Sequence, residues 1–323
     1  MNDIRKIFQH CEQVRIMDDG RILPLRFSDE RLGFYAQQPR TPYSQCATGV
    51  TAEFYTDAKE ISFEYKFTPP QFDYITADFF DILENDKYVK TLSPSMYTGK
   101  ITYKLRNSGK TKVCIYLPVG VNTEFKNFEL GNWEPVTQPK EKMLVLGDSI
   151  SQGLFGQNPY LAPIPQLARK AKVDYLNASV GGEIFRKDSI DPHLSFTPDI
   201  ILIELGSNDM GFVREMDKIS KNIDEFFEVL MNKYPKARKA AVTPFWFTDY
   251  GTSKEADERE ALSFKIRDKV FAVCKELNIP AFSGLDLFPH DPELYSDICH
   301  PNNEGFTLLV DNLYEKLKQH NIL

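Results

Sequence analysis

The sequence predicts an α/β protein of two domains, a doubly wound parallel sheet preceded by an antiparallel β-sandwich. Three observations support this prediction. The chain has 323 residues, whereas a single hydrophobic core usually stops growing at about 250–300 residues. Its first part alternates apolar and polar residues in short runs, and its second part alternates apolar strands with helical stretches. A segment with two prolines and no periodicity, 131–139, separates them, so we expect domains at 1–135 and 136–323.

Short alternating runs occupy the chain between about residues 20 and 130. Turn residues separate these runs, and long helical periodicity is absent. This pattern is typical of antiparallel strands with one buried face. The clearest predicted strands are 49–55, 60–67, 101–105 and 112–117.

The pattern changes at about residue 142, where nearly continuous apolar runs begin. Such runs indicate strands buried on both faces of a parallel sheet. Strands that alternate with helices predict a doubly wound domain. The predicted strands are 143–146, 200–203, 240–242 and, more weakly, 279–282. The predicted helices are about 160–172, 215–234, 254–277 and 303–319.

The composition excludes several classes of protein. The net charge is −7, so no basic surface is expected for nucleic acid or an anionic membrane. Residues 1–8 mix charges and lack the apolar stretch of a signal peptide, and no run reaches the roughly 18–20 apolar residues of a membrane-spanning helix. The five cysteines are scattered without a CxxC pair, which predicts reduced thiols and a cytoplasmic protein. A secreted form with a removed leader stays open.

The most informative stretch is 144–153, where a buried strand ends at Gly147 and a small polar loop begins with Asp148 and Ser149. Ligands bind beyond the carboxyl ends of the strands in open α/β sheets. A serine at this place can therefore direct its hydroxyl into a crevice and act as a nucleophile. The alternative is an ordinary strand-to-helix turn.

A second stretch, 297–301, supplies the groups that a nucleophilic serine needs. Acyl transfer requires a base for the hydroxyl and a carboxylate that fixes the tautomer of the base. His300 and Asp297 are three residues apart, so both side chains can meet across one tight turn. Pro301 disfavours helical geometry at His300, which indicates a loop. A solvated loop, or a metal site that includes His290, is the alternative, although no spacing is diagnostic of a metal.

Two further strand ends offer donors for an oxyanion hole. Gly181 and Gly182 follow one predicted strand, and Asn208 follows another. Glycine allows close approach of a backbone N–H, and an asparagine amide can donate to a developing oxyanion. Singly, each residue is more often a turn glycine or a helix cap.

Together, the stretches 147–150, 182, 206–209 and 297–300 resemble the four ordered blocks of the SGNH (GDSL-type) hydrolases over about residues 142–320. The resemblance implies a three-layer, flavodoxin-like fold. It implies Ser149 as nucleophile, His300 as base and Asp297 as its orienting carboxylate. The implied oxyanion donors are the backbone N–H groups of Ser149 and Gly182 and the side chain of Asn208. The choice between Gly181 and Gly182 stays open.

A β-rich domain before such a domain also resembles the two-domain bacterial carbohydrate esterases of family two, with a jelly-roll-like sandwich. This resemblance implies an acetylesterase that acts on carbohydrate esters, and the stretch 245–247 could stack on a sugar ring or belong to the core. A short-chain lipid esterase or acyl thioesterase is the alternative enzyme, and a carbohydrate-binding protein with an inactive hydrolase domain is the alternative of another class. We expect a small-molecule or oligosaccharide ester as partner, and neither nucleic acid nor a membrane. No dinucleotide or phosphate-loop motif is present, so we expect no cofactor and no metal. The oligomeric state stays open.

Overall fold

A computed structural model describes residues 3–38, 41–70, 79–94, 96–107 and 109–323 of the chain. The chain forms two compact units. The first comprises Met1–Pro139 and Gln157–Tyr160, and the second comprises Lys140–Gly156 and Leu161–Leu323. The division between the units therefore follows Pro139 and not residue 135, and it lies at the end of the segment 131–139 that separates the two sequence patterns. The return of 157–160 to the first unit was not predicted.

The first unit is an antiparallel sandwich, as predicted from its alternating runs. One sheet has the order β1 (Phe8–Gln9), β4 (Thr51–Thr56), β9 (Thr111–Tyr116), β6 (Phe80–Glu84) and β7 (Lys87–Leu92), with β11 (Trp133–Pro135) also paired to β4. The other has the order β2 (Gln13–Ile16), β3 (Ile22–Leu25), β10 (Asn122–Glu129), β5 (Glu60–Thr68) and β8 (Thr98–Lys104). A short helix, α1 (Asp29–Ala36), follows β3.

Aromatic side chains fill the core between these sheets. Phe54, Phe63, Phe80 and Phe125 are at most 1% exposed. The ring of Phe63 meets those of Phe80 and Phe125 edge to face, each at a centroid distance of 5.6 Å. Edge-to-face contacts are a preferred geometry of aromatic pairs. The alternating pattern of the sequence thus reflects one buried aromatic face on each sheet.

The segment Gln157–Tyr160 is held in the first unit by polar and aromatic contacts. Asp81 accepts hydrogen bonds from the backbone N–H of Tyr160 at 2.9 Å and from Nδ2 of Asn158 at 3.2 Å. The Tyr160 ring stacks on Tyr88 at a centroid distance of 5.5 Å. These contacts explain why a short piece of chain between β12 and α3 belongs to the sandwich.

The second unit is a doubly wound parallel sheet, as predicted. Its strand order is β13 (Asp174–Asn177), β12 (Lys142–Gly147), β14 (Ile200–Glu204), β15 (Arg238–Val242) and β16 (Ala281–Phe282), and each neighbouring pair is parallel. In chain order this is the 2-1-3-4-5 arrangement of flavodoxin-like folds. Its α-helices are α2 (Ser149–Gln152), α3 (Pro163–Ala171), α4 (Asp209–Phe212), α5 (Met216–Lys233), α6 (Lys254–Glu276) and α7 (Asn303–Gln319).

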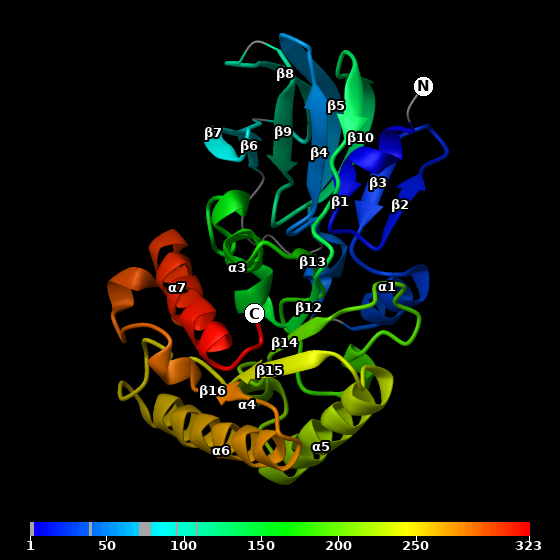
Figure 1. Cartoon of the computed structure of the whole chain (residues 1–323). Coiled ribbons are helices and arrows are strands. Elements are labelled where there is room, and N and C mark those ends of the chain that lie inside the picture. The colour runs from blue at the N-terminus through cyan, green and yellow to red at the C-terminus, as the bar shows by residue number, and fades with distance from the viewer. Residues whose placement is uncertain (1–2, 39–40, 71–78, 95, 108) are drawn as a thin grey trace. The chain divides into compact units, whose positions relative to one another are not determined.

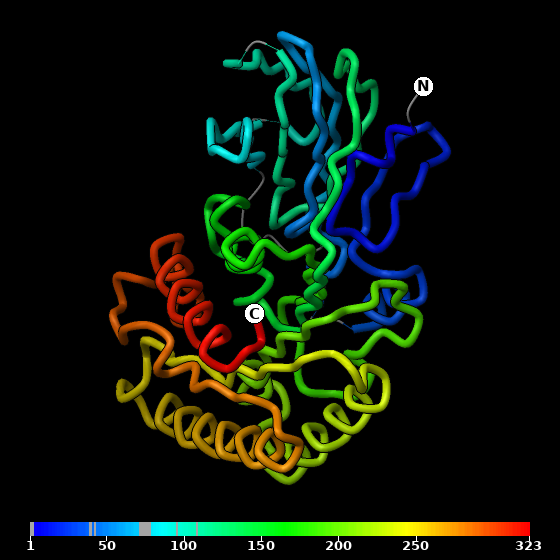
Figure 2. Tube along the Cα trace, viewed as in Figure 1, coloured from blue at the N-terminus to red at the C-terminus, as the bar shows by residue number. Residues whose placement is uncertain are grey.

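The long helices cover the two faces of this sheet (Figure 1). Helices α3 and α7 pack against each other on one face, where Leu167 and Phe306 join a core cluster with the strands. Helices α5 and α6 pack together on the other face, with Phe226 and Ile266 in a second cluster. Figure 2 shows the chain passing from β14 through α5 to β15 and then through α6 to β16.

Short 3-10 helices connect several elements: Ile4–Ile7, Pro42–Gln45, Pro159–Leu161, Lys187–Ser189, Gly284–Asp286 and Pro292–Leu294. None of the helices in the described part of the chain is long and apolar enough to cross a membrane.

The strand order places a switch point between β12 and β14. These strands are neighbours in the sheet, but the chain leaves β12 toward α3 and leaves β14 toward α5, on opposite faces. Ligands bind at such points in open α/β sheets, because the diverging connections leave a crevice beyond the strand ends. The sequence stretches that begin at Asp148 and at Gly206 lie at these two strand ends.

Candidate active site

Ser149 is the first residue of α2, directly beyond the carboxyl end of β12. Asp148 caps this short helix, because its Oδ1 accepts a hydrogen bond from the backbone N–H of Ile150 at 2.9 Å. Gly147 must be glycine, since a Cβ at this position would lie 2.8 Å from the Cβ of Ser151. A tight strand-to-helix turn therefore fixes the position of Ser149.

The side chains of Ser149, His300 and Asp297 form one hydrogen-bonded chain. His300 Nε2 lies 2.8 Å from Ser149 Oγ, and His300 Nδ1 lies 2.7 Å from Asp297 Oδ2. With a neutral imidazole, Nδ1–H donates to the carboxylate and Nε2 accepts from the hydroxyl. This is the arrangement in which an imidazole removes the proton of a nucleophilic serine. The structure thus brings together the three residues that the sequence predicted.

The loop around Asp297 holds its carboxylate in place. Asp297 Oδ1 accepts the backbone N–H groups of Cys299 and His300, both at 2.8 Å. Burial opposes ionisation of Asp297, but the hydrogen bond and the charge of His300, together with these two N–H groups, outweigh it and lower the pKa of Asp297 to about 2. The carboxylate is therefore ionised over the range in which enzymes usually work. The three-residue spacing in the sequence corresponds to this turn.

Asn208 follows β14 and points its amide toward the start of α2. Its Nδ2 donates to the backbone carbonyl of Glu183 at 3.0 Å and to Asp148 Oδ2 at 3.3 Å. The bond to Asp148 is long for an N–H···O contact. One N–H of the amide is thus held by a good hydrogen bond, while the other makes only a long contact and is the one available to an oxyanion near Ser149.

The two adjacent glycines after β13 differ in what their N–H groups do. Gly181 N–H donates to Gln152 Oε1 at 2.6 Å and is thereby occupied. Gly182 has φ 86, in the left-handed region that favours glycine. No hydrogen bond from its N–H to another described residue is found. Of the two glycines that the sequence left open, the geometry favours Gly182 as the donor to an oxyanion, and its role stays a prediction.

We expect Asn208→Ala to lower kcat by about 10²–10³-fold with a smaller change in KM, since an oxyanion donor acts mainly in the transition state. Steady-state kinetics on a short acyl ester tests this expectation, with the melting temperature as a measure of folding. A kcat within a factor of a few of the wild type would make Asn208 only a structural link between Glu183 and Asp148.

Comparison with known proteins identifies the family. Residues 145–308 match the model of the GDSL-like lipase/acylhydrolase family. The match covers half of the chain and includes Ser149, Gly182, Asn208, Asp297 and His300. The chain belongs to this family.

Individual proteins match this chain either over a shorter stretch than the family model or at low sequence identity. An arylesterase of Vibrio mimicus is 37% identical over 106 residues, which are 29% of this chain and 50% of the relative, so the chain spans about half the length of that curated protein. The salicylyl-acyltransferase of a tetracycline biosynthetic pathway has a similar fold, with a TM-score of 0.82, 15% identity and coverage of 98% of this chain and 95% of the other. A family two carbohydrate esterase from Clostridium thermocellum, solved with cellohexaose, gives a TM-score of 0.63, 15% identity and coverage of 93% and 99%.

The family blocks do not include Phe155, which covers one face of the His300 imidazole. The rings of Phe155 and His300 stack with centroids 4.1 Å apart and planes 20° apart. Phe155 has φ 69, an unusual conformation for a bulky residue. Its carbonyl accepts a hydrogen bond from Ser296 Oγ at 3.2 Å, next to Asp297. Sequence reasoning missed this residue, because no local pattern marks a ring that meets a histidine far along the chain.

Four buried carboxylates lie near Ser149. Asp148, Glu183, Glu204 and Asp209 are at most 2% exposed. Burial raises the pKa of Asp209 to about 7, although a hydrogen bond from the backbone N–H of Phe185 favours its charged form. Burial raises the pKa of Asp148 to about 6 as well. None of these acids was predicted to have a role, although three of them stand at or directly after the ends of predicted strands.

Asp297, Cys299 and His300 bring their ligand atoms within 4.8 Å of one another. Burial raises the pKa of the Cys299 thiol far above its usual value, and the thiolate is the form that binds metals. Both nitrogens of His300 are engaged in the chain described above. This set of residues therefore fits serine chemistry better than metal binding. His290, which the sequence analysis weighed as a ligand, instead bonds the carbonyl of Leu285 at 2.9 Å through Nε2.

The aromatic stretch 245–247 divides between core and surface. Phe245 and Phe247 are 1% and 7% exposed and belong to the two core clusters, so for them the core alternative is the correct one. Trp246 is partly exposed, and its ring stacks on His290 at a centroid distance of 4.9 Å with planes 5° apart. The next residue but one, Thr248, donates its backbone N–H to the carbonyl of Ile298 at 2.8 Å. Trp246 is thus tied closely to the Asp297 loop.

Proposed function

We propose that this protein is a serine esterase that removes short acyl groups, foremost acetyl, from carbohydrate esters through an acyl-enzyme. The observation that carries the proposal is the hydrogen bond of 2.8 Å between Ser149 Oγ and His300 Nε2 at the switch point of the sheet. Membership of the acylhydrolase family supports the class of reaction.

Acylation follows from this geometry. Ser149 Oγ attacks the carbonyl carbon of the ester while its proton passes to His300 Nε2. Asp297 holds the imidazole by Nδ1 and stabilises its charged form. The negative oxygen of the tetrahedral intermediate accepts hydrogen bonds from the N–H groups of Ser149 and Gly182 and from Asn208. The intermediate collapses when the C–O bond to the alcohol breaks, and the alcohol oxygen takes the proton from His300.

Deacylation repeats these steps with water. His300 Nε2 removes a proton from a water molecule, whose oxygen attacks the acyl carbon. The bond to Ser149 Oγ then breaks, and Ser149 recovers its proton from His300. The Phe155 ring stacked on His300 limits the imidazole to one plane, so that Nε2 faces Ser149 and the substrate in both halves of the reaction.

Two observations support a sugar hydroxyl as the leaving group. The partly exposed Trp246, held flat by His290 close to the Asp297 loop, offers an aromatic surface of the kind on which sugar rings stack. The fold likeness extends to a carbohydrate esterase solved with cellohexaose. Two exposed apolar side chains near the site, Ile298 at 47% and Phe212 at 39%, are the feature that favours an apolar acyl or alcohol part instead.

A panel of substrates separates these possibilities. We expect the highest kcat/KM on acetylated mono- and oligosaccharides, with a fall as the acyl chain of a nitrophenyl ester lengthens beyond a few carbons. A preference for long acyl esters or for acyl thioesters would replace the carbohydrate assignment by the lipid esterase or thioesterase. The panel includes an added alcohol acceptor, and an acyl group that passes mainly to the alcohol would indicate a transferase. The absence of turnover on every ester would favour a binding protein with a silent site.

A further inference from the structure

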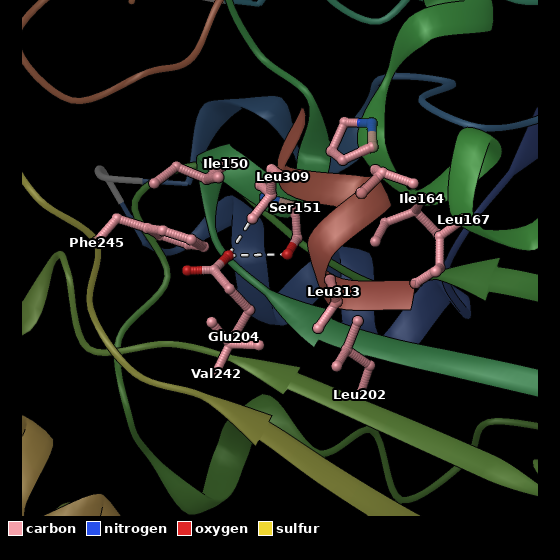
Figure 3. Close-up of a pocket in the computed structure, with 12 residues that line it drawn as sticks. Ile150, Ser151, Ile164, Leu167, Leu202, Glu204, Val242, Phe245, Leu309 and Leu313 are labelled. Carbon is pink, nitrogen blue, oxygen red and sulfur yellow. Dashed lines mark hydrogen bonds between the residues drawn. The ribbon is translucent and has the colours of Figure 1, made fainter. Parts of the chain in front are cut away.

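Glu204 is a buried acid for which the reaction just described has no use. It ends β14, one strand away from the nucleophile, and is 2% exposed. Apolar side chains such as Leu202, Val242 and Phe245 surround it and line a cavity of about 20 Å³ beside its carboxyl group (Figure 3). No cation among the described residues pairs with it. A buried carboxylate without a cation is costly, and such a group takes up a proton instead.

The hydrogen bonds of Glu204 indicate where that proton lies. Its Oε2 accepts both the backbone N–H and the Oγ–H of Ser151, at 3.3 Å and 2.8 Å (Figure 3). Its Oε1 is buried and receives no hydrogen from any N–H or O–H of a described residue. The carboxyl group of Asp148 is a close neighbour of Glu204, near enough for a hydrogen bond to join the two acids. Two carboxyl groups can form such a bond only if one of them carries a proton, and Oε1 is the oxygen left to carry it.

The other end of this bond reaches the oxyanion donors. Asp148 Oδ1 accepts the backbone N–H of Ile150, and its Oδ2 faces the amide of Asn208. Ser149 lies between Asp148 and Ile150 in the chain. The carboxyl pair thus stands directly behind the nucleophile and is joined by hydrogen bonds to a proposed donor of the oxyanion hole.

The charges around the pair determine which acid keeps the proton. Burial raises the pKa of both acids, and it raises the pKa of Glu204 well above its usual value. The charge of His300 favours the ionised form of Asp148, whereas the charge of Glu183 disfavours it. Glu204 faces Asp148 itself, which disfavours a second negative charge. Asp209 is also close enough to Glu183 and Asp148 for their charges to disfavour its ionisation.

We propose that Glu204 is a positioning residue that acts as a neutral carboxylic acid, donating its proton to Asp148 and thereby keeping Asp148 and Asn208 in the geometry of the oxyanion hole. This inference rests on the proposed esterase function. The shared proton leaves the pair with a single negative charge. A second charge would repel the developing oxyanion and would strengthen the hold of Asp148 on the Asn208 amide, drawing it away from the substrate.

Two substitutions separate this role from simple packing. Glu204→Gln has the shape of the protonated acid, because its oxygen can accept from Ser151 and its NH₂ can donate to Asp148. Glu204→Leu keeps the bulk but leaves both partners unpaired. We expect the Leu variant to have a kcat at least about tenfold below that of the Gln variant, with a smaller difference in KM, since a buried polar group without a partner is destabilised and the effect falls on a transition-state donor. Equal kcat values in the two variants would overturn the proposal.

Infrared spectroscopy tests whether Glu204 is protonated, and this test does not depend on enzymatic activity. At neutral pH the wild type should show the carbonyl stretching band of a protonated carboxylic acid that Glu204→Gln lacks. Glu53, a buried glutamate of the first unit, provides the matched control. Burial opposes its ionisation, but His10 and other hydrogen-bond partners outweigh it and lower its pKa to about 2, so Glu53→Gln should remove no such band.

The two readouts keep the inference separate from the function on which it rests. A wild-type spectrum that does not differ from Glu204→Gln in this band would refute the neutral acid, even if the esterase is active. A difference band in a protein that hydrolyses no ester would uphold the protonated Glu204 and contradict the proposed function and, with it, the positioning role.

Discussion

Replacing Ser149 by alanine is expected to lower kcat by about 10⁶-fold, the scale on which loss of a nucleophilic serine acts. The side chain makes its hydrogen bond to His300 and contributes little to the core, so the melting temperature should stay close to that of the wild type. Turnover of a nitrophenyl acetate and thermal unfolding measured on the same preparation test both expectations.

Ser253 provides a matched control with the opposite outcome. Its Oγ caps α6 by accepting the backbone N–H of Ala256 at 3.2 Å, and loss of such a cap costs about 1 kcal/mol of stability. Ser253→Ala should therefore melt earlier and keep its activity. If Ser149→Ala retained more than a small fraction of wild-type turnover, another residue would be the nucleophile.

Asp297→Asn is expected to lower kcat by about 10⁴-fold, as in other serine triads. The asparagine oxygen can still accept the N–H groups of Cys299 and His300, so the loop should keep its shape. The NH₂ group would face Nδ1 of His300 and turn it into an acceptor. The imidazole proton then moves to Nε2, and this nitrogen can no longer accept the proton of Ser149.

The pH dependence adds a second readout for Asp297. The pKa of this carboxyl is lowered to about 2, against an ordinary value of 3.8. Its stabilising contribution is therefore complete above about pH 4 and is lost only as the pH falls toward 2. Ionisation of Asp297 should thus produce no step in kcat/KM above about pH 4. A kcat of Asp297→Asn like that of the wild type would reduce the triad to the Ser149–His300 pair.

The sequence predicted those parts of the fold whose pattern is set by burial. The strands β12, β14 and β15 are buried except for the first residue of β12 and of β15, and apolar runs mark them. The helices α5, α6 and α7 were placed within about two residues, because one face of each is buried against the sheet. The sandwich was predicted as a class, whereas strands such as β7, with mostly exposed or half-exposed residues, gave no usable alternation.

The candidate site was predictable where chemistry constrains the residue type and the position along the chain. Ser149, Asn208, Asp297 and His300 follow strands or precede the last helix, and the structure places Ser149, Asp297 and His300 in hydrogen-bonding contact. Phe155 could not be found in this way, because its role depends on a ring contact across 145 positions of sequence, from 155 to 300.

The burial of individual polar and aromatic residues also could not be predicted from the local sequence pattern. Glu204 stands at the end of an apolar run and resembles an ordinary polar residue at a strand end, and only the packing around it reveals that it lacks a cation. The same holds for Phe245 and Phe247, whose aromatic character fits a binding surface as well as a core. Tertiary packing decides between these possibilities, since it determines which side chains meet solvent.

The central claim, that His300 activates Ser149, is tested most directly by labelling with a fluorophosphonate and locating the adduct by mass spectrometry. We predict a single adduct on Ser149 in the wild type, a much slower reaction in His300→Ala and none in Ser149→Ala. An adduct on another serine, or labelling of Ser149 at an undiminished rate without His300, would contradict the claim.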